Sequence, residues 1–159
     1  MTDAATGRVI VPCFDSLALR DIPAPDHADV VLVPLPAGAP TDPTVWAETI
    51  FSPASAPAWV KALFGVRQAL VGLIGVDRGP SDVFAVRETS GPEALLAAND
   101  RHLDFRAGVA VDEAARMVRV TTTVRLHGWR GRLYFAPVRL LHGPVTQAML
   151  RRAARRLAR

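Results

Sequence analysis

The stretch that decides the fold is residues 103–125, which read LDFRAGVAVDEAARMVRVTTTVR. Residues 103–111 and 117–125 follow a period of two, which is typical of β-strands, and the second segment is rich in β-branched side chains. The connection between them, residues 112–115, is too short for a parallel crossover. The stretch therefore predicts two neighbouring antiparallel strands.

The same period of two continues on both sides of this pair. It predicts further strands at residues 83–89, 94–98 and 132–141, joined by short, turn-rich segments. Upstream, residues 29–35 form a β-branched apolar run, and residues 9–11 can pair as a short edge strand. Together these segments predict a curved antiparallel sheet of six to seven strands.

Two helices are expected after the first strand. Asp42 can cap a helix whose first position is Pro43, so residues 44–51 are predicted to be a short helix. A second helix begins near Ala58. Its apolar residues recur at steps of three and four, which predicts one buried face comprising Trp59, Leu63, Val66, Leu70 and Leu73.

A long helix is expected at the C-terminus, over residues 142–159. Gly143 and Pro144 are typical of a helix start, and His142 precedes them. The apolar face of this helix carries Val145, Met149, Ala153 and Leu157. The prediction is an α+β fold in which this helix packs across the sheet.

Composition and length indicate one globular domain over residues 1–159, with an irregular, proline-punctuated segment at residues 1–25. The chain is 50% hydrophobic and 21% charged. Cys13 is the single cysteine, so an internal disulfide is excluded. Neither a basic leader followed by a long apolar stretch nor a membrane span is apparent, and we expect a cytoplasmic protein.

The positive charge is concentrated at the C-terminus. Five arginines contribute +5, and without them 14 basic residues face 15 acidic ones; the five are Arg151, Arg152, Arg155, Arg156 and Arg159. Basic residues in the last turns of a helix complement its dipole. No aromatic residue interleaves them to stack on bases, so we expect no nucleic-acid partner.

The order of elements resembles the helix-grip fold of the START-like superfamily, which includes polyketide cyclases and lipid-transfer domains. More specifically, the heptapeptide DRHLDFR at residues 100–106 is similar to that of an uncharacterised bacterial domain family. Residues 27–30, 58–63 and 131–135 resemble it too, and the resemblance covers residues 29–157. It implies a helix-grip fold with an internal cavity and carries no assigned activity. No Gly-x-Gly-x-x-Gly fingerprint occurs, and we expect no cofactor.

The heptapeptide contains the leading candidates for a catalytic site. Strand alternation puts His102, Asp104 and Arg106 on one face. In one interpretation they form a structural ion-pair network. In the other they project into the cavity, where His102 and Asp104 act as general base and orienter while Arg106 binds an anionic or enolate oxygen.

Three further residues are candidates for ligand binding. Trp59 is either a core residue or the wall of an apolar pocket, and Arg67 either pairs with an acidic residue or lines the cavity. Tyr134, the only tyrosine, is a candidate proton donor. No metal site is predicted, because the pair His102 and Asp104 is far in sequence from the other histidines, His27, His127 and His142.

Three functions follow from these features. The first is binding of a small apolar molecule between the sheet and the C-terminal helix. The second is an enzyme of cyclase, dehydratase or isomerase type that uses His102, Asp104 and Arg106. The third is a structural or interaction module with a filled core. The sequence does not choose between enzyme and binding protein, and it indicates no oligomeric state.

Overall fold

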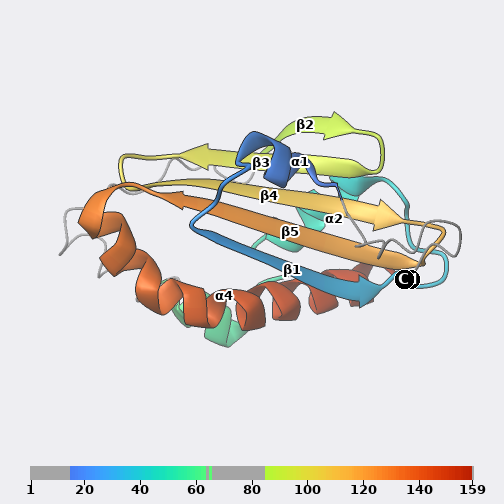
Figure 1. Ribbon diagram of the computed structural model, residues 1–159. Coiled ribbons are helices and arrows are strands. Elements are labelled where there is room, and N and C mark those ends of the chain that lie inside the picture. The colour runs from blue at the N-terminus through green and yellow to red at the C-terminus, as the bar shows by residue number, and fades with distance from the viewer. Residues whose placement is uncertain (1–14, 64, 66–84, 159) are drawn as a thin grey trace, which may run out of the picture.

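The computed structural model describes residues 15–63, 65 and 85–158 and contains, within them, a five-stranded antiparallel sheet (Figure 1). The strands follow the order β1-β5-β4-β3-β2, so β1 and β2 are the edges. Their bounds are β1 His27–Pro34, β2 Val86–Ser90, β3 Glu93–Asn99, β4 Leu103–Asp112 and β5 Met117–Leu126. The α+β class is confirmed. The predicted count of six to seven strands is wrong.

Helices cover both faces of the sheet. The short helix α1 (Leu17–Asp21) lies on one face, against β3, β4 and β5. On the other face, α2 (Pro43–Phe51) packs against β2, β3 and β4, while the long α4 (Gly128–Leu157) follows β1 and contacts α2 (Figure 1). Successive side chains along a strand point to opposite faces of the sheet, so they alternate between the face that α1 covers and the face that α2 and α4 cover.

The start of α1 is held by a buried carboxylate from the sheet. Glu93 is 5% exposed, and its two oxygens accept hydrogen bonds from the Ser16 hydroxyl at 2.6 Å and from the Leu17 N–H at 2.9 Å. Ser16 in turn caps the helix by accepting from the Ala18 N–H. Backbone donors at a helix start need such partners, so Glu93 fixes α1 on the sheet.

Helix α2 begins as predicted. The Asp42 carboxylate accepts from the Thr44 N–H at 2.8 Å, and Pro43 occupies the first turn. Trp46 is fully buried and donates its indole N–H to the Pro40 carbonyl at 2.7 Å.

The predicted helix near Ala58 is present at residues 58–63 and 65. Its expected apolar face is incorrect at Trp59, which is 45% exposed, whereas Val60 is buried. Val66, Leu70 and Leu73 lie outside the described residues, as do residues 9–11 and Cys13.

The largest correction concerns residues 132–141, which form part of α4 and not a strand. The helix begins at Gly128, well before the predicted start at residue 142. Its inward face is buried at both ends and partly buried at Val138 and His142 between them; its buried members are Gly131, Phe135, Thr146, Met149, Leu150 and Ala153. The burial of this face stabilises helix where the prolines suggested breaks.

Pro137 and Pro144 lie inside α4, which curves along the sheet (Figure 1). A helical proline leaves the carbonyl four residues earlier without its usual donor. Those carbonyls belong to Leu133 and Leu140, which are 59% and 73% exposed, so water can bind them. The prolines therefore bend the helix at positions where its free carbonyls face solvent.

The space between the sheet and the two larger helices is filled by side chains within the described part of the chain. The larger fully buried members of this core, all no more than 1% exposed, are Trp46, Ile50, Val60, Leu96, Val109, Val118, Val120 and Leu150. Among the described residues, no helix is both long enough and apolar enough to span a membrane.

Candidate functional site

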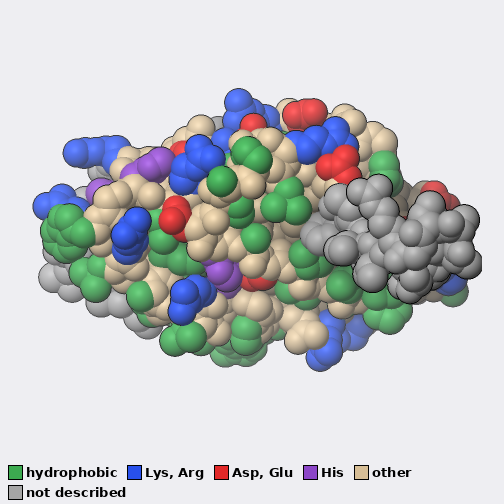
Figure 2. Space-filling model, viewed as in Figure 1, with side chains coloured by type: hydrophobic (Ala, Val, Ile, Leu, Met, Phe, Trp, Pro, Cys, Tyr) green, Lys and Arg blue, Asp and Glu red, His purple; other side chains and the backbone are tan. Residues whose placement is uncertain are grey.

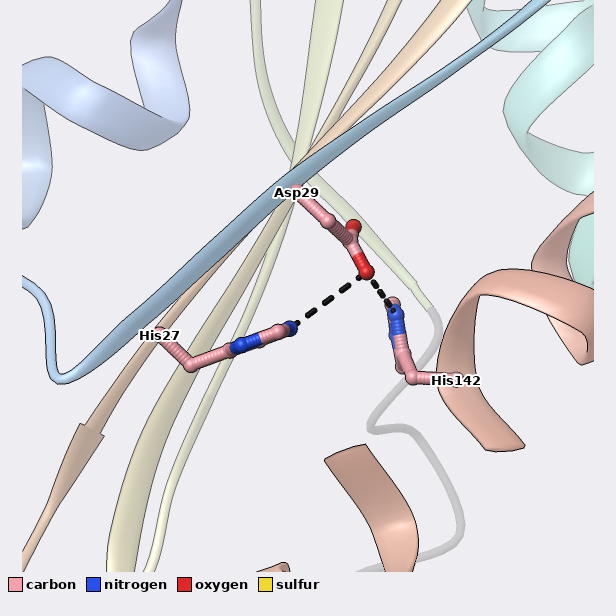
Figure 3. A group of neighbouring side chains, drawn as sticks. All are labelled: His27, Asp29 and His142. Carbon is pink, nitrogen blue, oxygen red and sulfur yellow. Dashed lines mark hydrogen bonds and ion pairs between the residues drawn. The ribbon is translucent and has the colours of Figure 1, made fainter. Parts of the chain in front are cut away.

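Three ionisable side chains meet where α4 passes the edge strand β1. His27 and Asp29 are two residues apart on β1, so both project from the face that α4 covers. His142 reaches them from the middle of α4 (Figure 3). We call His27, Asp29 and His142 the His–Asp–His cluster.

One carboxylate oxygen of Asp29 contacts both imidazoles. Its Oδ2 lies 2.6 Å from Nδ1 of His142 and 3.4 Å from Nε2 of His27 (Figure 3). A carboxylate can only accept hydrogen bonds, so each of these ring nitrogens donates when the carboxyl is ionised. The short bond to His142 leaves that ring's Nε2 for a further partner.

The electrostatics of the cluster favour an ionised Asp29. Partial burial raises the pKa of the Asp29 carboxyl, but hydrogen bonds and charge interactions with His142 and His27 outweigh it, and the net pKa is below the usual value. The second oxygen, Oδ1, is buried and has no hydrogen-bond partner among the residues that the structure describes. A buried carboxylate oxygen with free lone pairs is costly unless something binds it.

The rings are held in place by their neighbours. The His27 ring packs on Phe135, with ring centroids 5.1 Å apart, and lies edge-on to the His142 ring at 6.1 Å. All three side chains keep only 16–23% of their surface exposed. The cluster is thus ordered before any ligand arrives.

An open depression of about 310 Å³ follows the same seam between β1 and α4. It is lined by Val30, Val31, Leu32, Gly143, Pro144 and Gln147, which are next in sequence to Asp29 and His142. Figure 2 shows a histidine and an acidic side chain meeting at the surface beneath β1. The cluster therefore lies near solvent, at one end of a shallow groove whose exposed lining is both polar and apolar.

Residues 22–149 match a family described as a protein of unknown function (DUF2867). The chain belongs to this family. No curated protein and no solved structure matches the chain. The matched segment includes the whole His–Asp–His cluster and ends before the arginine-rich last turns of α4. The predicted membership of an uncharacterised family is confirmed.

Arg106, predicted to bind a ligand oxygen, is occupied by protein groups. It is 7% exposed, and its Nε donates to the Asp21 carboxylate of α1. Its Nη1 donates to Asn99 Oδ1 at 2.6 Å and to the Phe105 carbonyl at 2.8 Å. Arg106 lies on the α1 face of the sheet and forms an ion pair with Asp21, not with Asp104 as the network interpretation expected.

Within the described chain, no hydrogen bond or ion pair joins the side chains of His102 and Asp104. Asp104 pairs with His127 at 3.1 Å, at the start of α4. His102 is 6% exposed, and its Nε2 is buried without a hydrogen-bond partner within the described chain. Its backbone carbonyl accepts from the His127 N–H at 2.7 Å. A catalytic role for the two residues stays a prediction.

The remaining candidates lie apart from the cluster or outside the described chain. Tyr134 is half-buried on α4 and not on a strand, so the alternation used to orient it does not apply. Trp59 is exposed near the start of its helix, and Arg67 lies outside the described residues.

Sequence reasoning missed the cluster for a definable reason. His27 and Asp29 stand two apart, a spacing that shares one strand face and could have been noticed. His142 was assigned to a helix start 113 residues beyond Asp29. Only the path of α4 along β1 brings it to them.

Proposed function

We propose that this domain binds a small molecule in the seam between β1 and α4, with the His–Asp–His cluster at the polar end of the site. The single observation behind the proposal is the buried Oδ1 of Asp29, which has no hydrogen-bond partner among the described residues and belongs to the same seam as an open depression. Binding sites typically combine an apolar groove with a few fixed polar groups.

The proposal moves the ligand from the interior to the edge of the sheet. A helix-grip domain of the START-like type would hold its ligand between sheet and terminal helix. Here, within the described chain, that space carries Trp46, Leu96 and Leu150, all fully buried. Among the described residues, an open depression lies where α4 passes β1, which supports a site on that seam.

A second candidate function is acid–base catalysis of the isomerase or dehydratase type. The 2.6 Å contact between Asp29 and His142 favours it, because a carboxylate bound to Nδ1 orients the ring and leaves Nε2 as the base. His102 is a separate proposed base, because its buried Nε2 has no hydrogen-bond partner among the described residues.

A fragment screen by two-dimensional NMR tests the proposed site. With a library of small aromatic acids and amides, we expect amide shifts confined to residues 27–32 and 142–147. Leu32→Arg places a charge in the depression and should abolish these shifts. Leu133→Arg, on an equally exposed apolar residue of α4 outside it, should not.

Two results would defeat the proposal. One is a library without any hit on this seam, and the other is an equal loss of binding in both arginine variants.

A further inference from the structure

We propose that the His–Asp–His cluster is a binding site for one divalent transition-metal ion of the zinc class. The ligating atoms would be Nε2 of His27, a carboxylate oxygen of Asp29 and Nδ1 of His142. The inference goes beyond small-molecule binding and does not depend on it, since the metal can bind with no organic ligand present.

The spacing of the donor atoms fits a metal ion. The three atoms all lie within 4.8 Å of one another, with the two contacts to Asp29 at 2.6 and 3.4 Å. Ligands at about 2.1 Å from a tetrahedral ion lie roughly 3.4 Å apart. Shifts of less than about 1.5 Å would therefore place all three donors around one ion.

The types of donor select the metal. Two imidazole nitrogens and one carboxylate suit zinc, cobalt, nickel or ferrous iron, whereas calcium and magnesium prefer oxygen ligands alone. Neutral rings bind without net loss of protons, because the proton on each ligating nitrogen moves to the other ring nitrogen. Among the described residues, no lysine or arginine pairs with Asp29 and competes for its charge.

The surroundings of the cluster also suit a resident ion. Asp29 Oδ1 is a buried acceptor without a donor in the described part of the chain, and a cation is one group that satisfies it. The Phe135 ring supports His27, so the site is preorganised. Three protein ligands leave at least one coordination position open, as in catalytic rather than structural zinc sites.

Calorimetric titration of the chelator-stripped full chain tests the inference. We expect one Zn²⁺ per chain with a micromolar or tighter dissociation constant, a raised melting temperature and no binding of Mg²⁺ or Ca²⁺. His27→Ala and Asp29→Asn should each weaken Zn²⁺ binding at least about tenfold. His127→Ala is the matched control, because this histidine pairs with Asp104 outside the cluster.

A second measurement needs no variant and so does not depend on the folding of mutants. In imidazole ¹H–¹⁵N spectra of the wild-type chain, Zn²⁺ should shift the nitrogens of His27 and His142 and leave those of His102 and His127 unchanged. Shifts spread over all four histidines would overturn the inference. So would the absence of saturable one-to-one binding, which would make the cluster a hydrogen-bonded link between β1 and α4.

The two proposals fail separately. A chain that binds Zn²⁺ at the cluster but no fragment in the depression refutes the small-molecule site alone. A chain that binds fragments there but no metal refutes the metal site alone.

Discussion

The role of Arg106, a charged residue on strand β4, follows from the groups that it contacts. Its guanidinium is buried against the sheet, yet it is reached by Asp21, Asn99 and two backbone carbonyls. Such a group needs all its partners, because burying an arginine without them is costly. Its position thus ties α1 to β4, a role that alternation alone did not distinguish from ligand binding.

Removal of the Asp21 charge tests this role. Asp21→Asn keeps the shape but leaves the buried Arg106 without its anion, so we expect a loss of about 1–3 kcal/mol in the free energy of unfolding, measured by urea denaturation. The control is Asp15→Asn, which breaks the other Arg–Asp pair of this region. Both Asp15 and Arg20 are more than 60% exposed there, and almost no change is expected. Equal changes in the free energy of unfolding for the two substitutions would show that the Arg106–Asp21 pair does not stabilise the fold.

Only part of the His–Asp–His cluster could be predicted from neighbouring residues in the sequence. The spacing of His27 and Asp29 on a strand was readable, and Asp42 and Pro43 marked the start of α2 correctly. The third member, His142, required a contact across 113 residues. No local rule of charge or spacing supplies such a contact.

At the element scale, the strands were readable and the long helix was not. The predicted segments 103–111 and 117–125 differ from β4 and β5 by one residue each, since both follow a period of two and are bounded by turns. Gly143 and Pro144 led to a predicted helix start at residue 142, whereas both lie inside α4. The burial of one side of α4 outweighs these local signals, because Gly131 and Phe135 are buried before Gly143, and Thr146, Met149, Leu150 and Ala153 are buried after it.

The close approach of the start of α4 to His102, the residue before β4, depends on Gly131. A β-carbon at this position would overlap the backbone oxygen of His102, which itself accepts from the N–H of His127. Gly131→Ala should therefore destabilise the chain by about 1–3 kcal/mol despite the better helix propensity of alanine. Thermal and urea denaturation measure the change.

Gly65 provides the matched control for this substitution. It is helical and exposed, and a β-carbon there meets nothing within 4 Å. Gly65→Ala should leave stability unchanged or raise it by up to about 1 kcal/mol. A neutral Gly131→Ala would show that the start of α4 is not held against the His102 carbonyl.

At the scale of the whole molecule, two layers of helix enclose one sheet, and the arrangement explains where a site can form. The sheet face that α2 and α4 cover is packed with large side chains. On the other face, Glu93 and Arg106 bind α1 and the residue before it through Asp21 and Ser16. The seam at the β1 edge differs, because α4 brings a histidine there and leaves an open depression. Basic and acidic side chains are otherwise mixed over the face seen in Figure 2.

The central claim is that β1 and α4 form a metal site at this seam. The most direct measurement is an anomalous difference map from crystals of the chain grown with Zn²⁺ and recorded at the zinc edge. We expect one peak about 2.0–2.2 Å from His27 Nε2, His142 Nδ1 and a carboxylate oxygen of Asp29. A cluster that keeps its direct Asp29–His142 hydrogen bond, with no anomalous peak beside it, would contradict the claim.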